Sequence, residues 1–253
     1  MNIKTCIYCQ NTSLTKEHFW PKWLHDHIPD PPSNSRSYSI FESGIEIDKG
    51  ERPGHLKNKI IRKVCQSCNN GWMSTIESSV IPILKKMLNG SCVLNENQIL
   101  NLAQWIFLKV TTAEHDREDY VVTSKRHLVE FKSSLDIPKN FNIWLGKFDS
   151  GSGGTAYVRR SATISLSPTC FLETGTNFNT QTVTFCIGEI ILHVRHSTIL
   201  SLNFDTLVPD PDCLMPLYPD IGSIHWPPNP KLSIEEAGRL AYCLDPILEK
   251  IYS

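Results

Sequence analysis

The chain has 253 residues, nine of them cysteine, and its 25 basic and 26 acidic residues give a formal net charge of −1. A chain of this length can bury a core without disulfides, and the balanced charge excludes a globally basic nucleic-acid-binding protein. No apolar run approaches the ~20 residues that span a bilayer, and the first ten residues lack the apolar segment of a secretory signal. We therefore expect a cytoplasmic protein with no membrane contact and reduced thiols, so paired cysteines are interpreted first as metal ligands.

The first 90 residues predict a unit built around two cysteine pairs. We expect a hairpin around the first pair, a short helix that begins at Pro21, a long loop rich in Pro, Ser and Gly, and a strand that leads into the second pair. The corresponding ranges are 1–20, 21–28, 29–57 and 58–64. From Cys68 onward apolar residues recur every three or four positions, which predicts a helix that ends at Asn89-Gly90.

The remainder of the chain predicts helices first and strands afterwards. The helices are expected at 96–114 and 125–135, and the strands at 142–148, 157–166, 182–187 and 189–196, with Gly188 as a hairpin turn. Ser233 and Glu236 fit the capping box of a last helix over 233–251. The predicted class is α+β, with one domain over 1–92 and a second over 93–253 that holds an antiparallel sheet.

Four of the nine cysteines form the pairs Cys6-x-x-Cys9 and Cys65-x-x-Cys68. Two residues between cysteines let both thiolates of a tight turn face one ion, and two such turns complete the tetrahedral sulfur shell that suits structural zinc. The sequence therefore predicts one Zn²⁺ bound by all four. The other five are interpreted as small core residues: Cys92, Cys170, Cys186, Cys213 and Cys243.

Between the two pairs lies Glu17-His18-x-x-Pro21, and the second pair continues directly into Asn69-Asn70. In this order the motifs resemble the HNH endonucleases, also called His-Me finger or ββα-metal nucleases, in their zinc-stapled subgroup. The longer strings around these motifs are similar to those of small bacterial HNH proteins. The resemblance covers residues 1–90 and brings no known activity to the rest of the chain.

The resemblance implies a phosphodiesterase with His18 as general base and a catalytic Mg²⁺ or Mn²⁺ on Glu17 and an asparagine. The residues support this chemistry themselves, because an imidazole is the natural base near neutral pH and a carboxylate is a hard oxygen donor for such ions. Neighbouring strand residues point in opposite directions, so Glu17 and His18 can serve different partners. The zinc staple would bring Asn69 or Asn70 to the same ion, with Asn69 preferred. At family level the resemblance also implies an effector of bacterial antiviral defence.

Two features depart from the family pattern, and the first is that the asparagine after Cys68 is doubled, so the sequence alone cannot choose between Asn69 and Asn70. Second, the middle asparagine that holds the base histidine normally lies about five residues before the second cysteine pair, where this chain has Ile61, and Asn58 is carried over only weakly.

Other residues near the motifs have simpler interpretations. His25 and His27 are expected on the surface, His55 in a solvated loop, Trp72 in the core, and Glu77 on the helix surface or as packing support.

Basic charge gathers in the N-terminal part. Residues 1–90 contain 12 basic and 8 acidic residues, a net charge of +4, so the remainder carries −5. Within 49–63 six basic residues stand against one acid, which suits contact with phosphates more than with base edges. The nucleic-acid-binding candidates are Lys57, Lys59, Arg62 and Lys63. DNA is preferred over RNA as the partner, and the acidic C-terminal half is expected to dock a partner protein or second subunit or to regulate the nuclease.

Two alternatives remain open from sequence. In the first, residues 1–92 form a non-catalytic zinc module that binds nucleic acid or protein, which the missing middle asparagine favours. In the second, the C-terminal half is the functional part of an interaction protein.

Overall fold

The computed structural model describes residues 4–27, 35–42, 45–53, 58–116, 118–149, 154–164, 172, 176–199, 213–220 and 222–244. Helices and antiparallel sheets are combined in one fold, which confirms the predicted α+β class.

An antiparallel sheet of five strands forms the centre of the molecule. The strands are β6 (Phe141–Lys147), β7 (Gly154–Ala162), β8 (Thr180–Gly188), β9 (Ile190–Ser197) and β10 (Leu214–Tyr218), in the spatial order β10-β6-β9-β8-β7. The four strands predicted from 142 to 196 correspond to β6 through β9, whereas β10 was not predicted. Gly188 has a φ of +59° at the tight turn from β8 to β9, a conformation that glycine adopts without a steric cost.

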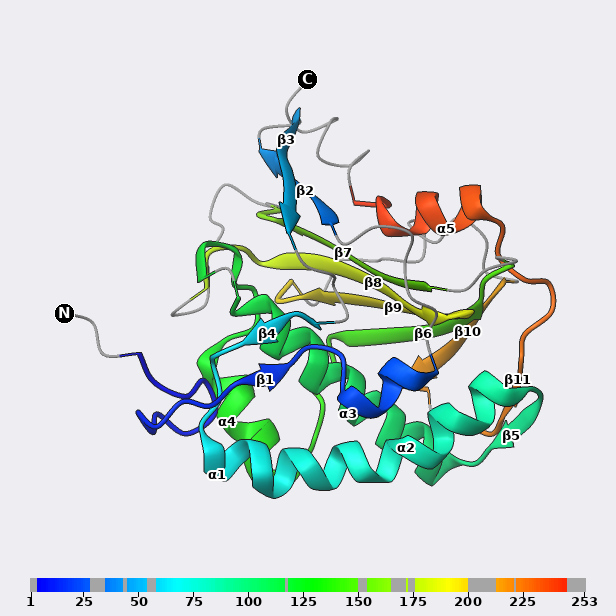
Figure 1. The fold of residues 1–253 in the computed structure, drawn as a ribbon, viewed down its shortest axis with the longest axis horizontal. Helices are drawn as coiled ribbons and strands as arrows, with labels where there is room; N and C mark the ends of the chain where they lie inside the picture. Colours follow the sequence, from blue (N-terminus) through cyan, green and yellow to red (C-terminus); the bar gives the residue numbers. More distant parts are fainter. Residues whose placement is uncertain are drawn as a thin grey trace.

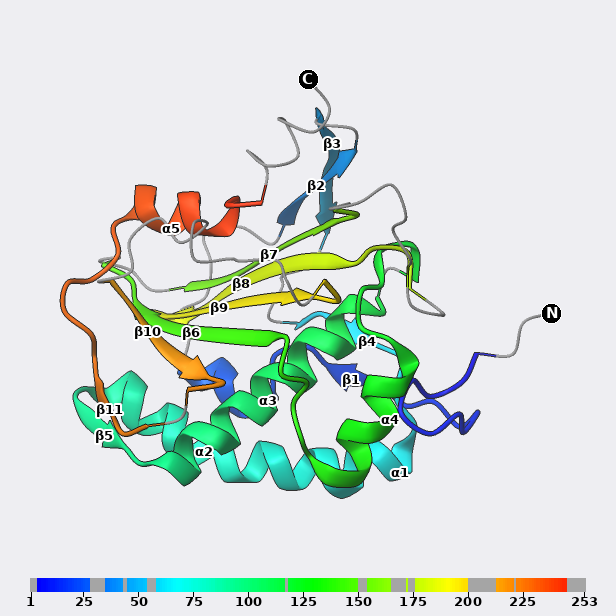
Figure 2. The same cartoon turned by 180° about the vertical axis from the view of Figure 1, so that it is seen from behind.

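Helix α3 (Glu96–Glu114) has the predicted bounds and lies between the sheet and helix α2 (Ser74–Asn89), as Figures 1 and 2 show. Asn95 and Gln98 cap its first turn reciprocally, each side chain accepting a hydrogen bond of 3.0 Å from the backbone N–H of the other. Every residue from Trp105 to Glu114 is buried, so α3 is the internal helix of the fold.

The prediction of a hairpin within residues 1–20 is wrong for the described residues: β1 (Glu17–His18) pairs instead with β4 (Ile60–Ile61), which lies within the strand predicted at 58–64. They pair antiparallel, with Glu17 opposite Ile61 and His18 opposite Ile60. The chain then enters α1 (Gln66–Cys68), a π-helical turn over Asn69–Met73, and α2. The β1–β4 pair is thus followed by a helix, as expected for a ββα unit, although a further pair of strands lies between β1 and β4 in the chain.

The prediction of a long loop over 29–57 is wrong for the described residues 35–42 and 45–53. Strands β2 (Ser35–Glu42) and β3 (Ile45–Pro53) pair antiparallel there as a hairpin inserted between β1 and β4. The Pro-, Ser- and Gly-rich composition obscured the alternation of polar and apolar residues over 37–48, which is the strand signal.

The remaining elements are short. They are η1 (Lys22–Asp26), β5 (Cys92–Leu94), η4 (Glu118–Tyr120), α4 (Lys125–Ser134), β11 (Ile224–Trp226) and α5 (Ile234–Ala241). Helix α5 lies on the face of the sheet opposite α3 (Figure 1), and the predicted Ser233–Glu236 capping box is present. It ends earlier than predicted, at Ala241, and 245–251 lie outside the described residues. Of the described helices, none combines the length and apolarity needed to cross a membrane.

One hydrophobic core runs through both predicted domains. The same cluster of buried residues includes Tyr8 and Leu24 from the N-terminal part and Val194 and Trp226 from the C-terminal part. The Tyr8 hydroxyl and the Thr111 hydroxyl of α3 form a buried hydrogen bond of 2.8 Å. Packing is therefore continuous across residues 92 and 93.

A buried histidine in the sheet makes the fold sensitive to acid. His196 is fully buried, its ring stacks on Phe141 with centroids 4.5 Å apart, and burial, aided by nearby His127, lowers its pKa to about 3. The unfolded chain binds this proton below pH ~6.5 but the folded chain does not, so the free energy of unfolding falls from there toward pH 3. We expect His196→Phe to lessen that loss by up to ~1.4 kcal/mol per pH unit, measured by urea denaturation between pH 7 and 4. The exposed His225→Phe is the control, and an unchanged slope in His196→Phe would contradict the assignment.

Candidate metal centre and the adjoining ion-pair cluster

The four predicted zinc ligands come together at one point. The sulfur atoms of Cys6, Cys9, Cys65 and Cys68 all lie within 4.8 Å of one another. The Sγ atoms of Cys9 and Cys65 are 3.4 Å apart and those of Cys68 and Cys9 are 3.6 Å apart. Zn–S bonds of ~2.3 Å in a tetrahedron place sulfurs about 3.8 Å apart, whereas a disulfide needs about 2.05 Å. The cluster therefore fits a four-coordinate zinc ion.

Local backbone structure positions both pairs. The first pair lies in a tight turn in which the backbone N–H of Gln10 donates to the carbonyl of Cys6, and Gln10 adopts a left-handed φ of +63°. The second pair lies at the start of the α1–α2 helical path, where Cys65 precedes the first helical residue. The first pair therefore lies in the tight turn that its spacing predicted, whereas the second pair lies at the start of a helix.

The surroundings also favour deprotonation of one thiol. Burial alone raises the pKa of Cys65, but hydrogen bonds with the Ser67 hydroxyl, 3.1 Å away, and with the Cys68 backbone outweigh this effect and lower the pKa to about 6. Burial raises the pKa of Cys6. Because metal ligation requires thiolates, the low pKa of Cys65 provides one ligand already ionised near neutral pH.

The other cysteines lie apart from this cluster. Cys213 and Cys243 are buried and Cys92 and Cys186 are half-buried, while Cys170 lies outside the described residues. Among the described residues the four-cysteine cluster is the only group of three or more Cys, His, Asp or Glu side chains arranged to hold a metal.

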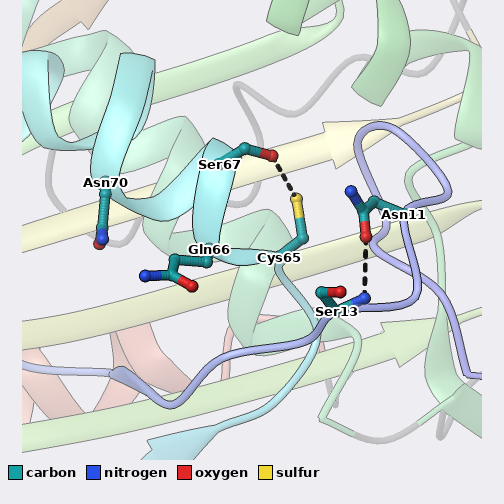
Figure 3. Close-up of a pocket in the computed structure, with 6 residues that line it drawn as sticks. All are labelled: Asn11, Ser13, Cys65, Gln66, Ser67 and Asn70. Atoms are coloured by element: carbon teal, nitrogen blue, oxygen red, sulfur yellow. Dashed lines mark hydrogen bonds between the residues drawn. The ribbon is translucent and has the colours of Figure 1, made fainter.

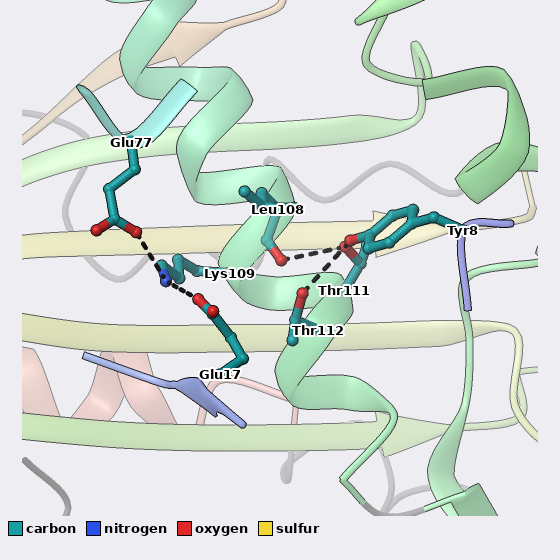
Figure 4. A network of polar contacts seen from close by, with 7 residues as sticks. All are labelled: Tyr8, Glu17, Glu77, Leu108, Lys109, Thr111 and Thr112. Carbon is teal, nitrogen blue, oxygen red and sulfur yellow. Dashed lines mark hydrogen bonds and ion pairs between the residues drawn. The ribbon is translucent and has the colours of Figure 1, made fainter. Parts of the chain in front are cut away.

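Glu17 lies in a cluster of ion pairs that connects β1, α2 and α3 (Figure 4). The ammonium of Lys109 is 3.1 Å from Glu17 Oε1 and 3.6 Å from Glu77 Oε2. The Lys109 side chain is 3% exposed, against 12% for Glu17 and 29% for Glu77. Two carboxylates of the N-terminal unit therefore converge on one cation that the internal helix supplies.

His18 lies half-buried on β1, next to Glu17 in sequence. Burial lowers its pKa, the positive charge of Lys22 adds to this effect, and the negative charge of Glu17 opposes it. The ring is therefore in its neutral, proton-accepting form at neutral pH. His25 also acts electrostatically on His18. The Nε2 atom of His25 is buried without a hydrogen-bond partner among the described residues.

The helical asparagines lie close to the cysteine cluster in sequence, and the structure gives them no direct bond to the Glu17–His18 pair in the part of the chain that it describes. Asn69 is half-buried within the π-helical turn. Asn70 is exposed and lines a hollow beside Cys65 together with Asn11, Ser13, Gln66 and Ser67 (Figure 3). Within the described residues neither asparagine has a hydrogen bond to Glu17 or His18, and the α2 residue that the structure brings toward Glu17 is Glu77.

This arrangement bears on whether a catalytic divalent ion fits. Glu17 and Glu77 supply the oxygen donors that Mg²⁺ and Mn²⁺ prefer. Both carboxylates face the same cationic position, so the donor chemistry fits such an ion. The Lys109 ammonium already lies against Glu17 Oε1, however, so an ion that uses this oxygen must compete with it.

The predicted nucleic-acid contacts have different surroundings. Lys57 lies outside the described residues, as does His55. Lys59 forms an ion pair of 2.7 Å with Asp116, Arg62 is exposed, and Lys63 is half-buried. Of the candidates whose side chains are described, Arg62 is the one most open to a ligand.

Sequence reasoning did not assign Lys109 or Lys22 to this site, and it gave Glu77 only a surface or supporting role. One signal was present for Lys109, because it is the single charged residue in the stretch from Trp105 to Ala113. A lysine on a fully buried stretch of helix needs a counter-charge, although the sequence does not say which carboxylate provides it.

Comparisons with known proteins add nothing to this geometry: no family model, no curated protein and no solved structure matches the chain. Any functional assignment therefore rests on the residues themselves and on their arrangement.

Proposed function

We propose that this protein is a zinc-stapled endonuclease of the HNH type that hydrolyses phosphodiester bonds, with DNA preferred over RNA. The observation that carries the proposal is the convergence of the four cysteines, which joins the β1–β4 hairpin to the helix at Cys68. A neutral, half-buried histidine stands on that hairpin with a carboxylate beside it. This is the layout expected when the hairpin supplies the base and zinc only holds the scaffold together.

In the proposed reaction His18 accepts a proton from a water molecule that attacks the scissile phosphate. A Mg²⁺ or Mn²⁺ ion held at Glu17 would polarise the phosphate and stabilise the leaving 3′ oxygen. Lys22, which acts electrostatically on His18, and the exposed Arg62 are suited to hold neighbouring phosphates. The products would carry 5′-phosphate and 3′-hydroxyl ends. The role of Asn69 or Asn70 as a further ligand, and service in antiviral defence, belong to the same proposal.

The test compares wild type with His18→Ala on supercoiled plasmid in the presence of Mg²⁺ or Mn²⁺. We expect loss of the general base to slow nicking by about 10²–10⁴-fold. His27→Ala is the matched control, because His27 is an exposed histidine directly after η1 and has no assigned role. Nicking by His18→Ala at the wild-type rate would contradict the proposal.

A second candidate is a non-catalytic zinc module that binds nucleic acid or protein. The specific observation in its favour is that Glu17 is already paired with Lys109. It predicts plasmid binding by wild type and His18→Ala alike, with no cleavage under any metal. The plasmid experiment described above therefore distinguishes the two candidate functions.

A further inference from the structure

Lys109 is unusual because it is a nearly fully buried lysine that contacts the candidate site from outside the ββα unit. It belongs to α3, 92 residues after Glu17 in the chain, and its Nζ is 3.1 Å from Glu17 Oε1 and 3.6 Å from Glu77 Oε2. The cluster thus couples the sheet-packing helix to the hairpin that carries His18 (Figure 4).

The burial of the three side chains increases toward α3. Glu77 is 29% exposed, Glu17 12% and Lys109 3%, so the carboxylates lie nearer to solvent than the ammonium that they share. The aromatic face of Trp105, 5.9 Å from Nζ, lies on the same helix. Because Lys109 is this deeply buried, it would act on a bound ion through its charge and through the two carboxylates, and not by contact from the solvent side.

The charges of the cluster do not cancel. Two carboxylates and one ammonium leave one net negative charge on the solvent side, which attracts a cation. The ammonium repels that cation and competes for Glu17 Oε1 at the same time. Glu77 matters here because it gives the ammonium a second partner when Glu17 is engaged elsewhere.

We propose that Lys109 is a positioning residue that sets the affinity of Glu17 for a divalent ion, with Glu77 retaining the ammonium when Glu17 binds the ion. The inference rests on the proposed function in that it takes Glu17 as the ion's ligand. In this proposal α3 contributes a residue to the site, although the sequence analysis assigned that helix to the second domain.

The experiment measures Mn²⁺ binding to the full-length, zinc-loaded protein by electron paramagnetic resonance, without nucleic acid. We expect Glu77→Gln to weaken Mn²⁺ binding about tenfold, because the ammonium then has only Glu17 as its partner. Lys109→Met removes the competitor and should tighten binding by about the same factor. Glu17→Gln should abolish the signal of bound Mn²⁺.

Glu130→Gln is the matched control, because Glu130 forms an exposed ion pair with Arg126 elsewhere. Glu77→Gln changes a partly exposed side chain, so it keeps the test informative even where Lys109→Met fails to fold. Wild-type affinity in Glu77→Gln, or no bound Mn²⁺ in wild type, would overturn the inference. If the protein still cleaves plasmid in a His18-dependent way under either of these two results, the role of Lys109 is wrong but the proposed nuclease activity is not. If plasmid cleavage is absent but the Mn²⁺ affinities of the variants follow the expected order, the proposed nuclease activity is wrong but the role of Lys109 is not.

Discussion

Replacement of Cys68 by Ser is expected to release the metal and to unfold the part of the molecule that carries Glu17 and His18. Strands β1 and β4 have two residues each, so their own pairing contributes little. Structural zinc contributes ~10–16 kcal/mol to folding in model zinc-finger peptides, and loss of one ligand removes a large share of this. The measurement is the zinc content of purified protein together with its thermal unfolding by circular dichroism.

Cys92→Ser is the matched control for this experiment. Cys92 is half-buried on β5 and lies outside the four-sulfur cluster, so the variant should retain one zinc per chain. If Cys68→Ser keeps full zinc content and the wild-type melting temperature, the cluster does not hold the unit together. The assignment of a structural zinc would then be wrong.

The cysteine cluster was predictable because its signal is local. The two cysteines of each pair are three positions apart, and thiolate chemistry leaves few alternatives for two such pairs in the reducing environment that the sequence led us to expect. The helix at 96–114 was equally accessible, since its apolar residues recur over nineteen positions. In both cases the residues that determine the structure are close together in sequence.

The ion-pair cluster was not predictable in the same way. Which carboxylate meets Lys109 depends on how α3 packs against β1 and α2, and this is set by the whole core and not by local pattern. Strands β10 and β11 were missed for a related reason: each is short and is held by a partner far away in sequence, β6 and β5 respectively. For the helical asparagines Asn69 and Asn70 the motif was visible in the sequence. It places them next to the cysteines but does not fix the direction of their side chains.

Aromatic side chains connect the cysteine cluster to the sheet, and this connection bears on the predicted boundary at 92/93. Tyr8 packs edge-on to Trp72 with ring centroids 5.0 Å apart, and Trp72 contacts Phe131 of α4 at 5.8 Å. Phe107 of α3 lies 4.4 Å from Phe131 and 4.8 Å from Phe141 of β6. The path of rings therefore passes from the four-cysteine cluster through α4 and α3 to the central sheet.

We expect Phe107→Ala to lower the free energy of unfolding by about 3–5 kcal/mol, because it opens a cavity at a fully buried position. If the core is one cooperative unit, zinc release must shift to lower urea concentration together with the loss of helical signal. The measurement follows circular dichroism and zinc capture by a chromogenic chelator in the same urea titration. Val129→Ala, at an exposed position of α4, should change the unfolding free energy by no more than about 0.5 kcal/mol.

The two transitions discriminate between one folding unit and two. Coincident midpoints in wild type and in Phe107→Ala mean that residues 1–92 do not fold independently of α3. A separate zinc-release transition that Phe107→Ala leaves unmoved would instead support two domains divided at residue 92. In that case the contacts of Tyr8 with Thr111 and of Glu17 with Lys109 would join two independently stable bodies.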